Sequence, residues 1–360
     1  MTLPDLRAGH RFRKVVLFTA RPFHLSLGIV ALATLGIFFR PLPLLAQVIE
    51  EFPIPSGSNG FHLTGGADGA VWFTEQGRMG RVRLFEQVTE FPLAPNASPE
   101  GIAPGPDGAL WITEAGKIGR MTTTGSLTEF PAPYPAPRSI VAGPDGGLWF
   151  TNFFEFFVGR ITTTGQTTVY PTLPTSIGPD QITEGSDGAL WFTEFMEPRI
   201  NRMTTSGQIT TFPIASAITT GLTAGPDGAL WLAIPGAGIA RVTTAGVYTL
   251  FPTSSVAGGP GTIAASSDGD LWFVENAAGK IGRISTSGVV SELSIPASIV
   301  PREIARGPDG AMWFTESGQA KIGRIALGVT PIPTLGAWGF ISLALCLAIL
   351  GSLLRRPVGS

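Results

Sequence analysis

Cysteine and histidine are almost missing from this sequence. Its one cysteine, Cys346, lies in an apolar C-terminal stretch, so no disulfide bond can form within the chain. Of the three histidines, His10 and His24 precede residue 47, which leaves His62 alone in the body of the chain. The sequence also has no Gly-x-Ser-x-Gly nucleophile elbow and no histidine-rich metal motif. The common serine, cysteine and zinc signatures of hydrolases are therefore absent.

Charge is scarce as well. Charged residues make up 14% of the chain and the net charge is −2, so we expect no nucleic-acid partner. Glycine and proline are abundant instead, with 47 and 31 residues. They recur at fixed spacing beside tryptophan, phenylalanine and isoleucine, which favours many tight turns over disorder.

Residues 1–46 have the three parts of a secretion signal. A basic segment comes first, an uncharged run covers residues 25–39, and Ala46 offers a small residue for cleavage. The basic residues are Arg7, Arg11, Arg13, Lys14 and Arg21. We predict a signal peptide, with an uncleaved signal anchor as the alternative. Either one exports the body of the chain.

Residues 328–360 are predicted to form a linker, a sorting motif, a transmembrane helix and an Arg-Arg end. No charge occurs from residue 326 to 354, and a helix over 338–354 would be about 25 Å long, enough for a short membrane span. By the positive-inside rule, Arg355 and Arg356 stay cytoplasmic. The Ile332-Pro333-Thr334-Leu335 segment, the helix and the Arg-Arg end together resemble the Ile-Pro-Thr-Leu sorting tail of Gram-negative bacteria. This resemblance implies an envelope protein in the periplasm or at the cell surface, anchored by the helix unless the tail is processed.

Between these ends the sequence repeats itself seven times. An Asp-Gly pair precedes a tryptophan by four residues in each repeat, and a Gly-Arg pair or a close variant follows about ten residues later. A Glu-Phe-Pro-like segment ends each of the first six units. The tryptophans are Trp72, Trp111, Trp149, Trp191, Trp231, Trp272 and Trp313. Each unit of about 40 residues reads as four short strands joined by tight turns. Residues 47–327 are therefore predicted to form an all-β, seven-bladed β-propeller of four-stranded blades.

The seventh repeat ends at Leu327 without its Glu-Phe-Pro-like strand. The missing copy stands before the first tryptophan, as Glu51-Phe52-Pro53. We expect this N-terminal strand to pair into the last blade, which closes the ring and removes an exposed strand edge.

The repeated Gly-Pro-Asp-Gly-Ala-Leu-Trp-Phe-Thr-Glu and Lys-Ile-Gly-Arg-Ile-Thr-Thr segments resemble the streptogramin B lyase (virginiamycin B lyase) propellers. The resemblance covers residues 49–327. It implies a Mg²⁺-dependent elimination that opens an ester-closed antibiotic ring on one face of the propeller. It also implies histidines in Pro-His-Gly-Ile-type segments of the last two blades, a tyrosine in the first blade and nearby glutamates.

This sequence departs from that pattern. Gly261 and Arg302 stand at the two histidine positions, and Phe61 stands at the tyrosine position. Glycine has no side chain and arginine cannot act as a base at neutral pH, so we expect the lyase machinery to be absent. If the chain is a lyase, the catalytic candidates are Glu316, Arg302 and Glu303, with Mg²⁺ as cofactor.

Two sets of residues are expected on the face where each blade begins. The first comprises blade-entry residues that would bind a polar or anionic ligand near the axis, unless they pair with one another: Phe61, Glu100, Arg138, Asp180 and Arg302. The second comprises the glutamates that end the second strands, of which Glu275 and Glu316 would bind a metal ion if there is one. The alternative is that each of these glutamates pairs with the arginine of a Gly-Arg segment.

An aromatic loop in the third repeat departs from the usual pattern. It contains Phe153, Phe154, Phe156 and Phe157, and Phe195 stands at the matching place of the fourth repeat. Exposed phenylalanines are unfavourable in water unless something covers them, so we expect a binding patch, with packing between blades as the alternative. A single histidine such as His62 is expected to be structural.

Two functional hypotheses remain. The first is a monomeric envelope propeller that binds a small molecule, a glycan or a protein through its loop face. The second is a Mg²⁺-dependent C–O lyase that acts on a streptogramin B antibiotic or another cyclic ester. The residues at the two histidine positions favour the first.

The two chain ends make a prediction about topology. A reporter fused after Ser360 is expected in the cytoplasm, or lost if the tail is processed, whereas the body is accessible from outside the inner membrane. Protease digestion of intact spheroplasts measures this accessibility. A body that stays protected would contradict export.

Overall fold

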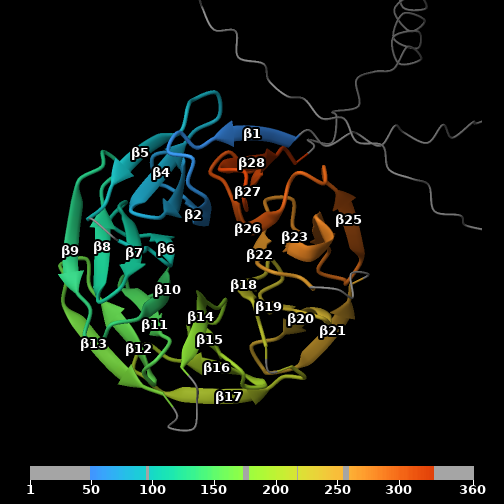
Figure 1. Ribbon diagram of the computed structural model, residues 1–360. Helices are drawn as coiled ribbons and strands as arrows, with labels where there is room; N and C mark the ends of the chain where they lie inside the picture. The colour runs from blue at the N-terminus through green and yellow to red at the C-terminus, as the bar shows by residue number, and fades with distance from the viewer. Residues whose placement is uncertain (1–48, 95–96, 173–177, 217, 254–258, 328–360) are drawn as a thin grey trace, which may run out of the picture. The chain divides into compact units, whose positions relative to one another are not determined.

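The computed structural model describes residues 49–94, 97–172, 178–216, 218–253 and 259–327. Within these residues, seven four-stranded antiparallel sheets are arranged in a ring around one axis (Figure 1). The seven-bladed, all-β propeller predicted from the repeats is confirmed. The predicted signal segment and C-terminal helix lie outside the described residues, and none of the helices within those residues is long and apolar enough to cross a membrane.

Every blade has the same order of strands, from the axis outward. The innermost strands are β2 (Gly60–Gly65), β6 (Ile102–Pro104), β10 (Pro137–Ala142), β14 (Pro179–Glu184), β18 (Gly221–Ala224), β22 (Ile263–Ala265) and β26 (Pro301–Arg306). The second strands are β3 (Val71–Glu75), β7 (Leu110–Glu114), β11 (Leu148–Asn152), β15 (Leu190–Glu194), β19 (Leu230–Ile234), β23 (Leu271–Glu275) and β27 (Met312–Glu316).

The outer half of each blade consists of two more strands. The third strands are β4 (Arg78–Val82), β8 (Lys117–Met121), β12 (Phe157–Ile161), β16 (Arg199–Met203), β20 (Gly238–Val242), β24 (Lys280–Ile284) and β28 (Lys321–Ile325). The outermost are β5 (Thr89–Pro92), β9 (Leu127–Pro131), β13 (Thr167–Pro171), β17 (Ile209–Pro213), β21 (Tyr248–Pro252), β25 (Val290–Ser294) and, in the seventh blade, β1 (Ile49–Pro53). One 3₁₀ turn, η1 (Asn276–Ala278), follows β23.

A buried tryptophan, an aspartate and an arginine connect three parts of a blade. In the third blade, Trp149 Nε1 donates to Asp145 Oδ1 at 2.9 Å and Arg160 Nε donates to Asp145 Oδ2 at 2.5 Å. Both bonds recur in the first, second, fourth, fifth and seventh blades. Burial alone would raise the pKa of Asp145, but the hydrogen bonds from Trp149 and Arg160 hold it below its usual value.

These contacts correct one expectation. The Gly-Arg arginines pair with the aspartates of the Asp-Gly turns and not with the glutamates that end the second strands. The sixth blade departs from the pattern, because Ser266 Oγ donates to Asp268 and Arg283 also contacts Asp270 at 2.7 Å. There the Nε1 of Trp272 has no hydrogen-bond partner among the described residues.

The core lies between neighbouring sheets and consists mainly of residues from the second and third strands, with single residues such as Leu63 and Ile140 from the innermost strands. Trp149 stacks on Tyr170 of the outermost strand with ring centroids 5.0 Å apart, and Trp313 stacks on Phe52 at 5.1 Å. The glycine of each Gly-Arg pair makes room for an aromatic or branched residue of the second strand. A Cβ atom at Gly323, for example, would overlap the ring of Phe314.

The N-terminal strand closes the ring, as the sequence predicts. β1 pairs with β28 along its whole length, so the seventh blade combines the two ends of the propeller. Two ion pairs cross this junction, between Lys321 and Glu51 at 3.1 Å and between Arg324 and Glu50 at 3.2 Å. On the inner side, β2 of the first blade contacts β26 and β27 of the seventh.

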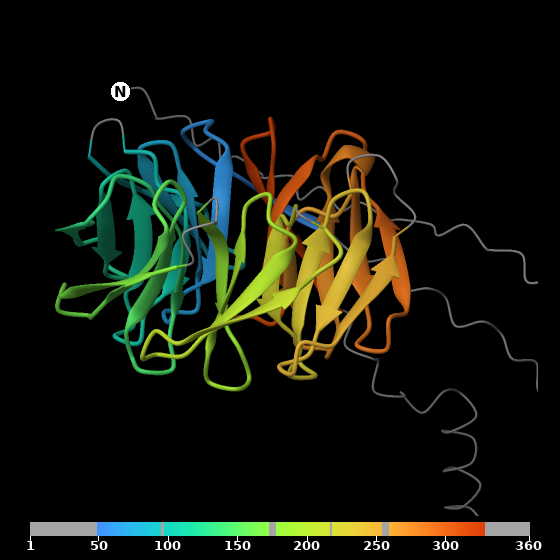
Figure 2. The same ribbon diagram turned by 90° about the horizontal axis from the view of Figure 1, so that it is seen from below.

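The propeller has two faces, which Figure 2 shows from the side. We call the face on which the innermost strands begin the loop face; there Glu316 ends β27 opposite Lys321. At the other end of the same sheet, Ile49 pairs with Ile325. The first strand thus begins and the last strand ends on the opposite face, which we call the exit face.

Removing residues 49–55 tests the ring closure. This deletion exposes the edge of β28, the Trp313 ring and two basic side chains, so we expect the free energy of unfolding to fall by several kcal/mol. Denaturant unfolding of both chains measures the loss. An unchanged midpoint would contradict a structural role for β1.

Candidate functional site

The blade-entry residues occupy irregular positions at the start of the innermost strands. In the seventh blade, Pro301 pairs with Glu316 and the next pair is Ile304 with Phe314, so Arg302 and Glu303 form a bulge. The same register shift occurs in the first, third and fourth blades. Bulges re-aim side chains. The first bulged residues lie one position nearer the loop face, at what we call the rim. The second bulged residues of the four blades all line one cavity among the innermost strands, which we call the channel: His62, Ser139, Gln181 and Glu303.

Threonines of one blade hold the entry residues of the next. Thr113 Oγ1 donates to the carbonyl oxygen of Arg138 at 2.5 Å, and Thr151 Oγ1 donates to that of Asp180 at 2.7 Å. Thr315 Oγ1 makes the corresponding bond across the ring closure. The repeat therefore fixes the backbone of the rim, while the side chain at each entry position is free to differ.

The rim has two arginines in different states. Arg138 Nε lies 3.1 Å from Asp180 Oδ1, and its guanidinium stacks 4.6 Å above the ring of Phe153. Arg302 stacks 4.9 Å above Phe61, and its side chain makes no ion pair or hydrogen bond within the described part of the chain. The expected mutual pairing thus holds for Arg138, whereas Arg302 has no such partner among the described residues.

A histidine and a glutamate from neighbouring blades meet inside the channel. His62 Nδ1 lies 3.6 Å from Glu303 Oε2, beside a cavity of about 130 Å³ that Arg138, Ser139 and Gln181 also line. Burial lowers the pKa of His62, but the charge and hydrogen bond of Glu303, together with the charge of the exposed Glu100, raise it above its usual value.

The pKa of Asp180 is raised like that of His62, but for a carboxyl group a raised pKa favours the neutral form. Burial raises the pKa of Asp180 above its usual value, although Arg138 opposes the shift. The charge of Glu100 adds to the rise. Five blades therefore place ionisable groups within electrostatic reach of one another at the mouth of the channel.

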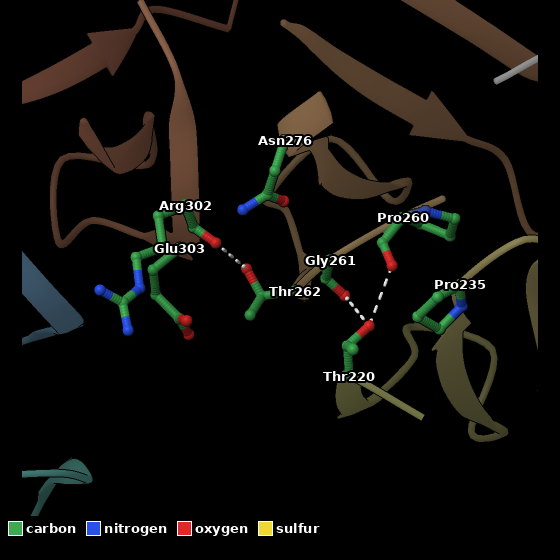
Figure 3. Close-up of a pocket in the computed structure, with 8 residues that line it drawn as sticks. All are labelled: Thr220, Pro235, Pro260, Gly261, Thr262, Asn276, Arg302 and Glu303. Atoms are coloured by element: carbon green, nitrogen blue, oxygen red, sulfur yellow. Dashed lines mark hydrogen bonds between the residues drawn. The ribbon is translucent and has the colours of Figure 1, made fainter. Parts of the chain in front are cut away.

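A larger pocket of about 290 Å³ lies in the fifth, sixth and seventh blades (Figure 3). Its lining residues are Thr220, Pro235, Pro260, Gly261, Thr262, Asn276, Arg302 and Glu303. The hydroxyl of Thr220 donates to the carbonyl oxygens of Pro260 and Gly261, each 2.9 Å from Thr220 Oγ1. Thr262 Oγ1 accepts the N–H of Ile304 at 3.1 Å.

A neighbouring side chain fills the space beside Gly261, which stands at one of the two histidine positions of the family pattern. A Cβ atom at Gly261 would lie 2.5 Å from Asn276 Oδ1, so the Asn276 amide occupies the space that a larger residue would take. In Figure 3 this amide points into the pocket. It makes no hydrogen bond to another described side chain, and Arg302 is likewise unpaired. Among the described residues that line this pocket, Asn276 and Arg302 thus have side-chain donors that no other described side chain engages.

The glutamates that end the second strands do not line the mouth. Glu75, Glu114, Glu194, Glu275 and Glu316 are all buried inside their own blades. Burial, with a contribution from Glu51, raises the pKa of Glu316 to about 7, although Lys321 opposes the shift. Burial likewise raises the pKa of Glu75 to about 7, against a hydrogen bond from Ser56.

These positions do not fit a magnesium site. Glu275 and Glu316 belong to separate blades and are each opposite a lysine of the third strand. Among the described residues, no group of three or more histidine, cysteine, aspartate or glutamate side chains is placed to hold a metal ion. Glu275 and Glu316 therefore do not come together as one pair of carboxylates for a Mg²⁺ ion.

The aromatic loop is part surface and part core. Phe154 is 72% exposed and Phe156 is also exposed. The ring centroid of Phe153 lies 5.2 Å from that of Phe154 and 5.3 Å from that of Phe195, so Phe153 joins the third and fourth blades. Phe157 corrects the expectation of a four-residue patch, because it is only 4% exposed and packs against Phe150.

Several residues at the mouth of the channel are not predicted from the sequence. His62 was expected to be structural, yet it lies beside Glu303 in the channel. The sequence does not single out Ser139, Gln181 or Asn276. The register of the repeat could have indicated His62, Ser139 and Gln181, because each follows directly after a blade-entry residue. For Asn276, only the structure reveals the contact with Gly261.

Comparison with known proteins adds to this geometry. The model of the virginiamycin B lyase family matches residues 45–217 and 114–331. A crystal structure of selenomethionine-substituted virginiamycin B lyase from Staphylococcus aureus is 36% identical, with a TM-score of 0.72 over 78% of this chain and 99% of that one. A streptogramin B lyase structure is 33% identical, with a TM-score of 0.73 over 78% and 97%.

A third structure concerns the same enzyme with a ligand. A catalytically inactive histidine-to-alanine variant of the S. aureus lyase, solved with quinupristin, is 36% identical, with a TM-score of 0.72 over 78% of this chain and 99% of that one. No curated protein sequence matches the chain significantly.

The raised pKa of Glu316 predicts how stability depends on pH. The folded protein keeps this proton up to about pH 7, whereas the unfolded chain releases it near 4.5, so the carboxyl lowers stability as pH rises between these values. Relative to Glu316→Gln, the wild type should lose up to roughly 3 kcal/mol across this range. Denaturant unfolding at a series of pH values measures the difference, and parallel curves would refute it.

The aromatic loop predicts opposite results at adjacent positions. Phe154→Ser and Phe156→Ser should leave the free energy of unfolding nearly unchanged, because both side chains are exposed. Phe157→Ser removes a buried ring and should cost about 3 kcal/mol or more. Thermal unfolding of the three variants checks this, and a large loss for Phe154→Ser would assign the whole loop to the core.

Proposed function

The chain belongs to the virginiamycin B lyase family, and within that family we propose that it binds a small ligand with an anionic group without opening a cyclic ester. The ligand occupies the 290 Å³ pocket at the mouth of the loop face. The single observation that supports this most is that Arg302 and Asn276 line the same pocket and that neither side chain has an ion-pair or hydrogen-bond partner within the described residues.

The chemistry of this pocket indicates the class of ligand. A guanidinium offers a planar set of donors that matches a carboxylate, and hydrogen bonds to a charged group are about twice as strong as neutral ones. Phe61 holds Arg302 from one side at 4.9 Å, which limits the freedom that binding would remove. Pro235 and Pro260 provide an apolar wall for the remainder of the ligand.

The replaced histidines argue against catalysis of the family reaction. The S. aureus relative is catalytically inactive when one histidine is changed to alanine. In this chain the two positions of the family histidines contain Gly261 and Arg302, and neither provides a base. The buried glutamates stay in their own blades and cannot reach the pocket as a replacement.

The location of the protein belongs to the same proposal. Residues 1–46 export the body, and the C-terminal helix anchors it in the membrane, either in the periplasm or at the cell surface. The protein acts as a monomer, and the exposed Phe154 and Phe156 extend the binding face toward a glycan or a protein.

A C–O lyase is the second candidate. The observation that favours it is the 36% identity to virginiamycin B lyase over 99% of that enzyme's length. His62, with Glu303 beside it, is the one histidine that could act as a base at this mouth. Such a lyase would require Mg²⁺, and the two candidate ligands Glu275 and Glu316 belong to separate blades.

Arg302 and Arg306 provide a matched test of the binding site. Both lie on β26 and neither makes an ion pair with a described residue, but Arg306 lies at the opposite end of the strand. A thermal-shift screen with pairs of carboxylic acids and their amides should find acids that stabilise the wild type and Arg306→Ala. Arg302→Ala should bind these acids about tenfold more weakly or worse. Equal binding by all three proteins, or equal preference for the amides, would refute an anion site at Arg302.

A further inference from the structure

The exit face is chemically uneven around the ring. Each of the first six blades has a turn at this face between its third and outermost strands. In the second to sixth blades the turn has one geometry, in which a threonine or serine hydroxyl accepts the N–H of the residue four positions later. That residue is Ser126, Gln166, Gln208, Val247 or Val289. The backbone is thus the same from blade to blade, and only the exposed side chain changes.

The change follows the position of the chain ends. The polar residues occupy the second, third and fourth blades, whereas Val247 and Val289 occupy the fifth and sixth. The seventh blade contains Ile49 and Ile325, where the described chain enters and leaves the ring. The apolar turns therefore belong to the two blades that precede the seventh, from which the chain continues into residues 328–360.

The first blade, on the other side of the seventh, continues this pattern. Its turn presents Phe85, which is 74% exposed and has a φ of 71°, a conformation that a bulky side chain rarely adopts. Val247 and Val289 are 60% and 68% exposed. The neighbouring Glu86 is compensated by Arg81 at 3.9 Å and Arg83 at 3.7 Å.

Charge divides the exit face in the same way. Arg306 ends the innermost strand of the seventh blade, is exposed, and makes no ion pair within the described residues. The equivalent residue of the fourth blade, across the ring, is the exposed Glu184, since Glu184 pairs with Leu190 as Arg306 pairs with Met312. The sector with the chain ends is thus apolar with an unpaired cation, and the opposite sector is polar with an anion.

We propose that this sector, formed by Phe85, Val247, Val289 and Arg306, lies against the lipid bilayer in which the C-terminal tail is anchored. Exposed apolar side chains beside a basic residue are typical of surfaces that bind the membrane interface, where Arg306 contacts anionic headgroups. The proposal rests on the anchoring stated above. It places the loop face, with the Arg302 pocket, away from the membrane and open to ligand.

Labels at equivalent turns test this orientation. Full-length protein with Cys346→Ser receives one new cysteine, Val247→Cys or Val289→Cys in the apolar sector, and Gln166→Cys or Gln208→Cys as matched controls. Each carries a polarity-sensitive fluorophore and is reconstituted in vesicles of phosphatidylcholine and phosphatidylglycerol. A lipid-borne quencher should reduce the signal at 247 and 289 about twofold more than at 166 and 208, because interfacial residues insert about 5–10 Å.

Three other outcomes would each contradict one part of the proposal: the orientation, the contact with lipid or the anchoring. Equal quenching at all four sites on vesicles that float with the protein would refute the orientation and leave the anchoring intact. A blue shift at 247 and 289 without lipid quenching would assign the sector to a protein partner or a second copy. Protein that fails to float with the vesicles would refute the anchoring, and with it this proposal.

Discussion

The bond between a buried tryptophan and the aspartate of an Asp-Gly turn is the interaction on which the propeller depends. In the third blade, the carboxylate of Asp145 accepts hydrogen bonds from the indole N–H of Trp149 and from the Nε–H of Arg160. One carboxylate thus connects the inner turn, the second strand and the third strand. The indole satisfies its only donor and still stacks on the outermost strand. The sixth blade, in which Trp272 lacks this bond within the described part of the chain, shows that a ring of seven accommodates one exception.

A repeated scaffold of this kind separates stability from function. The blade contacts fix the backbone at the loop face through threonine bonds between blades, so the entry side chains are released from any role in the core. The same applies at the exit face, where one turn geometry presents glutamine in one blade and valine in another. Arg302 of the ligand pocket and the side chains of the proposed membrane-facing sector both stand at positions whose residue type differs from blade to blade.

The sequence predicted the fold well because a period of about 40 residues with turn residues at fixed offsets permits few architectures. It predicted the closing strand for the same reason. It failed where contacts join distant segments: His62 meets Glu303 only because the ring closes, and the Gly-Arg arginines reach an aspartate across the hairpin. Phe157 was misjudged because the sequence does not say where the aromatic loop ends and β12 begins.

The central claim is that this member of the lyase family binds at its mouth without opening an ester ring. The most direct test incubates the full chain with a streptogramin B antibiotic and Mg²⁺ and follows the antibiotic by liquid chromatography and mass spectrometry. Elimination leaves the mass unchanged, so the measurement relies on retention time. The account predicts that the antibiotic peak stays unaltered. A new peak of equal mass, formed in proportion to the protein, would contradict it.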